Sequence, residues 1–239
     1  MDKNQRKVWN DNHRILKEII VKSEKHTEAI HLFLSQHTLL HTATTGRLDQ
    51  ENLQDSLLLN LDESIFRLYP VKTPDTKNSI AWHLWHTTRI EDMTMNILVA
   101  GGDQVLTKKN WLERLNIPFE HSGNDMPEKE IAELSMCIDF NALLRYRSEV
   151  GRRTQEIISQ LEPGQFTVQV DPNRIKQLFN ENAVTQQSSW LAEYWSKKTI
   201  AGLVLMPATR HIVIHLNKCI RIKDRYQKNL ISNEKAFLK

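Results

Sequence analysis

The chain has 239 residues, of which 40% are hydrophobic and 26% charged, a composition typical of soluble globular proteins and not of disordered or membrane proteins. The net charge of +3 is well mixed along the chain, so we expect no nucleic-acid partner. The first twenty residues show no secretion signal, and no apolar run approaches the roughly 20 residues of a membrane span. Cys137 and Cys219 have no CxxC spacing, which favours a reducing compartment. We therefore expect a cytoplasmic protein that does not enter a membrane.

Helical periodicity dominates the first hundred residues. Seven glycines and seven prolines in 239 residues favour long helices over many short strands. A first long helix is predicted from about residue 12 to about residue 42, ended by Gly46. A shorter amphipathic stretch follows and stops at Pro70. The next helix runs to Ala100, with Asn78 as its predicted N-cap.

The second half of the chain also favours helices. Residues 103–125 read as a loop with a short helical piece, and a helix start is predicted at Asp125. A long helix capped by Asp139 carries Gly151 in its middle, which costs about 1 kcal/mol relative to alanine. A close helix crossing or a ligand at that glycine would offset the cost.

The remaining segments complete an all-α prediction. "FTVQV" is the only convincing strand-like run and is too short to build a sheet. Asp171 and Pro172 start another helix, and Pro207 interrupts the last helical segment. With no repeat or linker in the sequence, we predict a single domain over residues 1–239, with a core from about 12 to 230.

The strongest chemical signal is "RHIVIHLNK" near the C-terminus. His211 and His215 are four residues apart, so a helix places both imidazoles on one face. This is a common way for one helix to offer two nitrogen ligands to one metal ion. Their stripe also contains Val204, Ala208 and Ile222, so the pair is predicted to face an apolar interior.

A second predicted helix, "SIAWHLWHTTRIED", contains further histidines that could bind the same metal ion. His83 and His86 share a face with Ile90, whereas Asp92 lies on the opposite side. One inward histidine from this motif and two from the last helix would make a three-histidine site. Three neutral nitrogen ligands leave coordination positions open, as in catalytic zinc sites.

Other readings of the histidines remain open. A single inward histidine is usually a core residue with a hydrogen-bond partner, but several unpaired imidazoles in one interior carry a large desolvation cost. His37 and His41 form another HxxxH pair. We expect them around the ligands or in the substrate pocket, then in core packing, and least of all as direct ligands. Glu91 points away from the His86 stripe and is not chosen as a ligand.

The arginines and the tryptophans each have more than one possible role. Arg147 lies among apolar residues of its helix, where it either pairs with a buried acid or anchors an anionic group of a substrate. Arg89 is predicted on the outer side of its helix in a structural role. The tryptophans Trp82, Trp85, Trp190 and Trp195 are expected in the core or an interface, or around a pocket. The sequence contains no GxGxxG, GxxxxGK[ST], GxSxG or HExxH motif.

"SIAWHLWHTTRIEDMTMNILVA" and "MPATRHIVIHLNKCIRIKDR" together resemble the DinB/YfiT-like superfamily of bacterial metalloproteins. The resemblance implies a DinB-like four-helix bundle, here with additional short helices and loop insertions. The family's HxxxxE register is matched by His86 and Glu91. This implies His86, His211 and His215 as metal ligands, with His83 as a neighbour in the pocket.

The resemblance also implies one divalent metal ion, namely zinc, nickel, manganese or iron. Family members with known activities include thiol-cofactor transferases and isomerases. We therefore expect a metal-dependent enzyme that activates a water or a low-molecular-weight thiol, as a transferase or a hydrolase, with His37, His41, His83 and Arg147 as pocket candidates. The alternative is a non-catalytic, stress-related protein that binds a metal or a ligand. Apolar residues on more than one side of the 79–100 helix are compatible with a homodimer.

Overall fold

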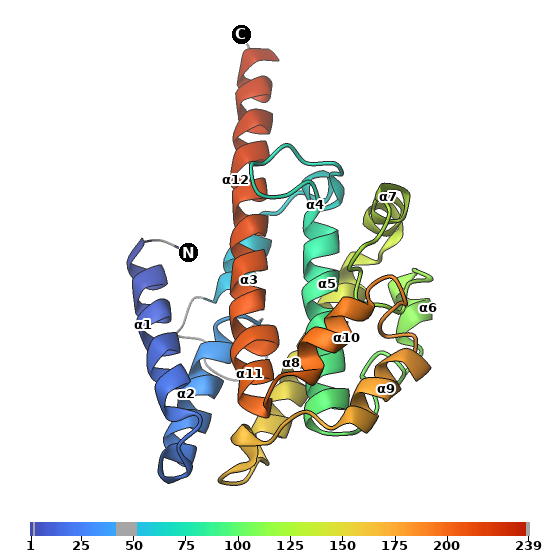
Figure 1. Cartoon of the computed structure of the whole chain (residues 1–239). Helices are drawn as coiled ribbons and strands as arrows, with labels where there is room; N and C mark the ends of the chain where they lie inside the picture. Colours follow the sequence, from blue (N-terminus) through green and yellow to red (C-terminus); the bar gives the residue numbers. More distant parts are fainter. Residues whose placement is uncertain (2, 42–51, 238–239) are drawn as a thin grey trace.

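The protein is built from helices, as seen in a computed structural model that describes residues 1, 3–41 and 52–237, with side chains up to residue 228 (Figure 1). Its α-helices are α1 Lys3–Ile19, α2 His26–Thr38, α3 Leu53–Leu58, α4 Glu63–Arg67, α5 Ile80–Asp92, α6 Trp111–Leu115, α7 Glu128–Cys137, α8 Phe140–Ser159, α9 Pro172–Asn180, α10 Ser189–Ser196, α11 Ile200–Leu205 and α12 His211–Phe237. Within these residues β-pairing is limited to two isolated bridges. The all-α prediction is confirmed.

Four long helices form the bundle: α2, α5, α8 and α12. Helix α5 packs against α8 on one side and α12 on another, and α2 packs against α8. Helix α1 lies antiparallel to α2 at the edge of the bundle, and α9 and α10 lie across the lower right of Figure 1. The candidate histidines of the sequence lie on α5, on α12, and in α2 and the turn after it, so they face the interior of this bundle.

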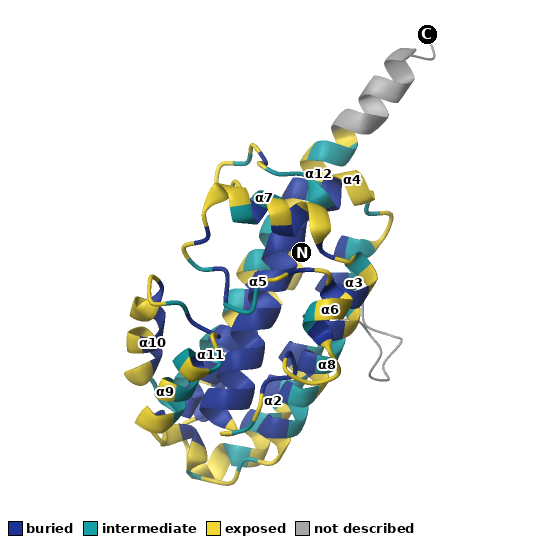
Figure 2. Cartoon of the chain, turned by 90° about the vertical axis from the view of Figure 1, so that its right-hand side faces the viewer, coloured by how far each residue is buried: buried dark blue, intermediate teal, exposed yellow. Residues whose placement is uncertain are grey.

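Helix α5 is the central element, because each of its 13 residues is buried (Figure 2). A π-helical segment, Met93–Val99, continues it and is buried as well. The sequence predicted one inward face for this helix and an outer side that includes Arg89. That prediction is wrong, because the segment after residue 103 covers the outer side.

Arg89 shows how this covering works. Its guanidinium donates hydrogen bonds to the carboxylate of Asp92 at 3.1 Å, to Tyr146 Oη at 2.8 Å and to the backbone carbonyl of Glu120 at 2.6 Å. Asp92 also accepts from the backbone N–H of Val105 at 2.8 Å. The buried charges therefore tie α5 to the 103–125 loop and to α8, which is a structural role as predicted, but in the interior.

Several predicted boundaries differ from the structure. The first long helix is two helices, because the chain turns at Ser23–Lys25 and α1 packs back on α2; Gly46 lies outside the described residues. Ser79, and not Asn78, caps α5 by accepting a hydrogen bond from the Trp82 N–H. Asp125 has a φ of 57°, and α7 begins only after Pro127.

Other local predictions are confirmed. Asp139 accepts from the Ala142 N–H and caps α8, and Asp171 caps α9 with Pro172 in its first turn. Pro207 interrupts the last helical segment within a π-helical stretch, Met206–Arg210. These positions depend on neighbours in sequence alone, which explains why they could be predicted.

By length and composition, one helical stretch among the described residues qualifies as a membrane span, Ile200–Lys228. Of its most apolar window, 56% is buried against the rest of the protein. Its apolar residues thus have protein partners, as in the core helix of a bundle.

Candidate metal centre

Three imidazoles converge between α5 and α12. The Nε2 atoms of His86 and His211 are 3.2 Å apart, and the rings of His211 and His215 have centroids 4.4 Å apart. One ring nitrogen from each of His86, His211 and His215 lies within 4.8 Å of the others. The structure therefore brings together the three residues that the sequence proposed as ligands.

The start of α5 holds His86 in place. The Ser79 cap fixes the first turn, and the Trp82 ring stacks on His86 with centroids 4.5 Å apart and an interplanar angle of 9°. Nδ1 of His86 donates to the carbonyl of Ser122 at 2.6 Å. This bond leaves Nε2 facing His211, in the tautomer that a metal ligand needs.

The start of α12 orients the other two imidazoles. Because Pro207 has no N–H, the regular hydrogen-bond ladder is interrupted, and Thr209 Oγ1 donates to the carbonyl of Leu205 at 2.8 Å. Regular α-helix begins at His211, so His211 and His215 lie one turn apart on one face. π-Helical turns are often found beside functional sites.

His83 lies behind the cluster. Its Nδ1 is 2.9 Å from Nδ1 of His215, and its Nε2 is 3.0 Å from Thr76 Oγ1. The contact with His215 leaves Nε2 of His215 for the cluster. His83 therefore orients a candidate ligand, in the way that outer groups commonly orient metal-bound histidines.

The charge state of the cluster suits a cation. Burial lowers the pKa of His86 to about 4. The pKa values of His211 and His215 lie well below the ordinary value, mainly because of burial and to a smaller extent because of the neighbouring histidines. Near pH 7 all three imidazoles are neutral, which is the form that binds metals. Two nitrogens on a tetrahedral zinc ion lie about 3.3 Å apart for bonds of about 2.0–2.1 Å. The distance of 3.2 Å between His86 and His211 fits such an ion.

A hollow of about 200 Å³ opens beside these histidines. Its walls are formed by His86, Ile90, Asn124, Trp190, Leu191, Tyr194, Trp195, Met206, Pro207 and His211. Most of these side chains are apolar or aromatic, so the hollow suits the apolar part of a small molecule. We call it the α10 pocket, because α10 supplies Trp190, Leu191, Tyr194 and Trp195. Trp190 and Trp195 thus line the pocket, one of the roles considered from the sequence.

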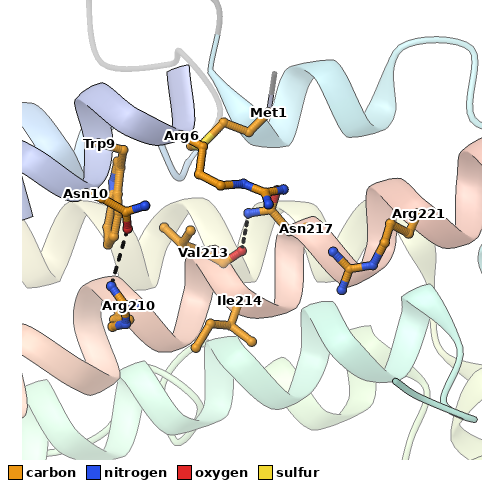
Figure 3. A pocket seen from close by; sticks show the side chains of 9 residues that line it. All are labelled: Met1, Arg6, Trp9, Asn10, Arg210, Val213, Ile214, Asn217 and Arg221. Atoms are coloured by element: carbon orange, nitrogen blue, oxygen red, sulfur yellow. Dashed lines mark hydrogen bonds between the residues drawn. The ribbon is translucent and has the colours of Figure 1, made fainter. Parts of the chain in front are cut away.

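A second hollow, of about 220 Å³, lies between α1 and α12 (Figure 3). Arg6, Arg210 and Arg221 border it, and Arg210 donates to Asn10 at 3.4 Å. The residues that α12 contributes to this hollow lie on the helix face next to the face of His211 and His215. Guanidinium groups do not bind metal ions, so this groove does not contribute to the metal centre.

His37 and His41 lie elsewhere, together with Glu91. Nε2 of His37 is 2.7 Å from Glu91 Oε1, and all three side chains are buried. Arg147 is also fully buried, and its guanidinium donates to Gln54 at 2.7 Å and to Thr87 at 3.1 Å. His37, His41 and Arg147, which the sequence analysis gave as candidates for a substrate pocket, therefore do not line the α10 pocket. They are separated from it by the body of α5.

Some residues of the centre could not be found from the sequence. The Ser122 carbonyl and Asn124 come from the loop before α7, and Met206 is the first residue of the π-helical stretch after α11. A backbone carbonyl leaves no signature in a sequence. The aromatic spacing of Trp190, Tyr194 and Trp195 was a signal for a shared face, but it does not say what that face covers.

Comparison with known proteins agrees with this architecture. The model of the DinB superfamily matches residues 37–206, which is more than half of the chain. The chain belongs to the DinB superfamily. The match includes His86 but ends before His211 and His215. The assignment of these two histidines as candidate ligands therefore depends on the geometry described above.

Structural similarity extends over most of the chain. The crystal structure of a conserved protein from Enterococcus faecalis is similar with a TM-score of 0.52 and 15% sequence identity. The similarity covers 81% of this chain and 94% of the other. At this identity the match shows a shared fold and nothing about activity. No curated protein matches the chain.

Proposed function

We propose that this DinB superfamily protein is a metal-dependent enzyme of the transferase or hydrolase type. His86, His211 and His215 would hold one divalent ion, either zinc, nickel, manganese or iron. The bound ion supplies Lewis-acid chemistry that lowers the pKa of a water or of a low-molecular-weight thiol. The observation that carries the proposal is that His86 and His211 belong both to the cluster and to the wall of the α10 pocket.

Some residues would bind the substrate, and others would hold the metal ligands in position. The aromatic and aliphatic walls of the α10 pocket bind the apolar part of the substrate and exclude water from it. Asn124 is the polar side chain in that wall besides the histidines and Tyr194, and its amide can orient a polar substrate group. Trp82, the Ser122 carbonyl and His83 keep the three imidazoles in position.

An open ligand set favours the enzyme over a storage protein. Three neutral histidines do not complete the coordination of any of these ions. Two of the three histidines, His86 and His211, line the α10 pocket, so a substrate in the pocket can reach the open positions. A small thiol with an apolar electrophile is the substrate pair that we favour, because none of the described residues that line the pocket is a lysine, an arginine or an acid. Hydrolysis of an apolar ester or amide is the competing reaction.

The test is an activity assay on the zinc-loaded full chain with glutathione and 1-chloro-2,4-dinitrobenzene, and in parallel with p-nitrophenyl acetate. We expect one reaction to depend on metal and to be lost in His211→Leu, while the exposed-histidine control His31→Ala keeps it. A perturbation of the cobalt(II) spectrum by glutathione would support thiol binding at the ion. Turnover that is equal in the metal-free protein or in His211→Leu would contradict the proposal.

A further inference from the structure

A second group of metal-binding side chains lies on the other side of α5. His37 and His41 come from the end of α2 and the turn after it, and Glu91 comes from the end of α5. One nitrogen or oxygen atom from each lies within 4.8 Å of the others. Glu91 is five residues after His86, about 7.5 Å along the helix, and points to a different face. The two groups are therefore distinct sites.

Three buried atoms of this group have no hydrogen-bond partner among the residues that the structure describes. They are the two ring nitrogens of His41 and Oε2 of Glu91. Nε2 of His41 is 3.2 Å from Oε2 of Glu91, but the contact does not have the geometry of a hydrogen bond. Buried polar atoms normally have a partner, and one shared cation would satisfy Nε2 of His41 and Oε2 of Glu91 at once.

His37 can join the same site. Its Nε2 lies 2.7 Å from Glu91 Oε1, and its Nδ1 lies 3.3 Å from the side-chain amide of Gln155. An amide can accept a hydrogen bond from Nδ1–H through its oxygen as well as donate one through its nitrogen. Gln155 thus permits the tautomer in which Nε2 is free to bind a metal. The distance between His37 and Glu91 would have to lengthen by roughly half an ångström to suit a tetrahedral ion.

Helix α8 leaves room for the His41 ring at one glycine. A Cβ atom added to Gly151 would lie 2.6 Å from Nδ1 of His41 and 2.8 Å from Cε1. Any other residue would therefore push the imidazole out of this position. This explains a glycine in the middle of a long helix, where it is otherwise unfavourable.

The charge of the group also favours a cation. Burial alone would raise the pKa of Glu91, but His41 and His37 outweigh burial and lower it, so the carboxylate is ionised. The buried Arg147 interacts electrostatically with Glu91, but it donates its hydrogen bonds to Gln54, Thr87, Thr88 and the Leu40 carbonyl. Two histidines and a carboxylate are a known ligand set for zinc.

We propose that His37, His41 and Glu91 form a second, buried metal site that binds a divalent transition-metal ion independently of His86, His211 and His215. Its ligand set contains an anion and is enclosed by α2, α5 and α8. The alternative is a metal-free network in which Glu91 is shared by two histidines. The two differ in the number of ions that the chain binds.

The decisive experiment removes the first site and counts ions at the second. The full-length double variant His211→Leu/His215→Leu is loaded with zinc, desalted and analysed for metal per chain. We expect one zinc ion per folded chain, and none after His41→Leu is added; wild type should hold two. A folded double variant without zinc would overturn the second site. Wild type with a single ion, retained in the double variant and lost in His41→Leu, would instead contradict the first site and the proposed function.

A substitution outside the ligands protects the test against misfolding. Gly151→Ala should displace His41 and weaken zinc binding in the double variant by about 10–100-fold, as changes around metal ligands do. Gly202→Ala is the matched control in α11, because its Cβ would meet no atom closer than 3.4 Å. Competition with a chromophoric chelator measures both affinities, and circular dichroism checks folding. Equal affinities in the two folded variants would contradict the proposal.

Discussion

The two histidine clusters share a pattern and differ in their surroundings. Each combines an HxxxH pair with one residue of α5, which is His86 in one cluster and Glu91 in the other. The first cluster borders the α10 pocket, and its His211 and His215 are only partly buried. The second is fully buried and contains a carboxylate. The same spacing in the sequence therefore supplies an accessible neutral site and an enclosed charged one.

The two ligand sets would affect a bound metal ion differently. A neutral, accessible set of ligands leaves the charge of a bound ion available to a substrate, whereas an enclosed carboxylate neutralises part of that charge. Our proposals therefore place the reaction at the first cluster and structural support at the second. The following predictions examine this contrast, from the largest expected effect to the smallest.

Removing the carboxylate should destabilise the protein most. Glu91→Leu leaves His37 and His41 buried without their acidic partner, and we expect a loss of about 3–5 kcal/mol in the free energy of unfolding. Urea denaturation of the metal-free protein measures it. The triple variant His37→Leu/His41→Leu/Glu91→Leu should regain most of the loss, because no buried polar group is left unpaired. A loss below about 1 kcal/mol in the single variant would show that the cluster is not a coupled unit.

Acid should destabilise the first cluster. The pKa of His86 is about 4 in the folded protein against an ordinary value of 6.5, so its imidazole is neutral in both states above that value. Below pH 6.5 the unfolded chain binds a proton that the folded protein excludes, and stability falls until about pH 4. The loss for His86 alone is about 3 kcal/mol.

Denaturant midpoints of the metal-free protein between pH 7 and pH 4 measure this effect. In His86→Leu/His211→Leu/His215→Leu the decline should be shallower, because three of the excluded protonation sites are gone. An equally steep decline in that variant would place the acid sensitivity elsewhere, for example at His13 or His121, whose pKa values burial also lowers.

Loss of an orienting residue should weaken metal binding at the first cluster only. His83→Phe removes the contact with Nδ1 of His215 and should lower zinc affinity there by about 10–100-fold. Chelator competition measures it, with zinc at the second cluster as an internal control. A drop at both clusters would indicate a general loss of structure.

The smallest effect is expected at the rim of the pocket. Trp190 is 49% exposed, and its indole N–H donates to Asp125 at 2.7 Å. Trp190→Ala should raise the KM for an apolar substrate several-fold, with little change in kcat or zinc content. Tyr194→Phe keeps the aromatic wall and serves as the matched control. A lower zinc content in Trp190→Ala would place this residue in the metal centre itself.

Local sequence was sufficient for much of this description. The all-α class, the caps at Asp139 and Asp171 and the interruption at Pro207 all follow from neighbouring residues or from helical periodicity. The pairing of His211 and His215 follows from the helical repeat in the same way. The assignment of His86 as ligand and His83 as its neighbour came from family resemblance and stays a prediction. The tertiary structure adds the contacts of His86 with the Ser122 carbonyl and of His83 with His215.

The tertiary structure alone decided what surrounds each face. Periodicity gives the direction of a side chain around its helix but not the segment that covers it. For this reason α5 was expected to have an outer side, and Glu91, which points away from the His86 stripe, was not chosen as a ligand. In the folded protein, residues from 37 to 41 and from 103 to 125 cover those faces, and Glu91 becomes the centre of a second cluster. Such contacts join positions more than ten residues apart, and no local pattern encodes them.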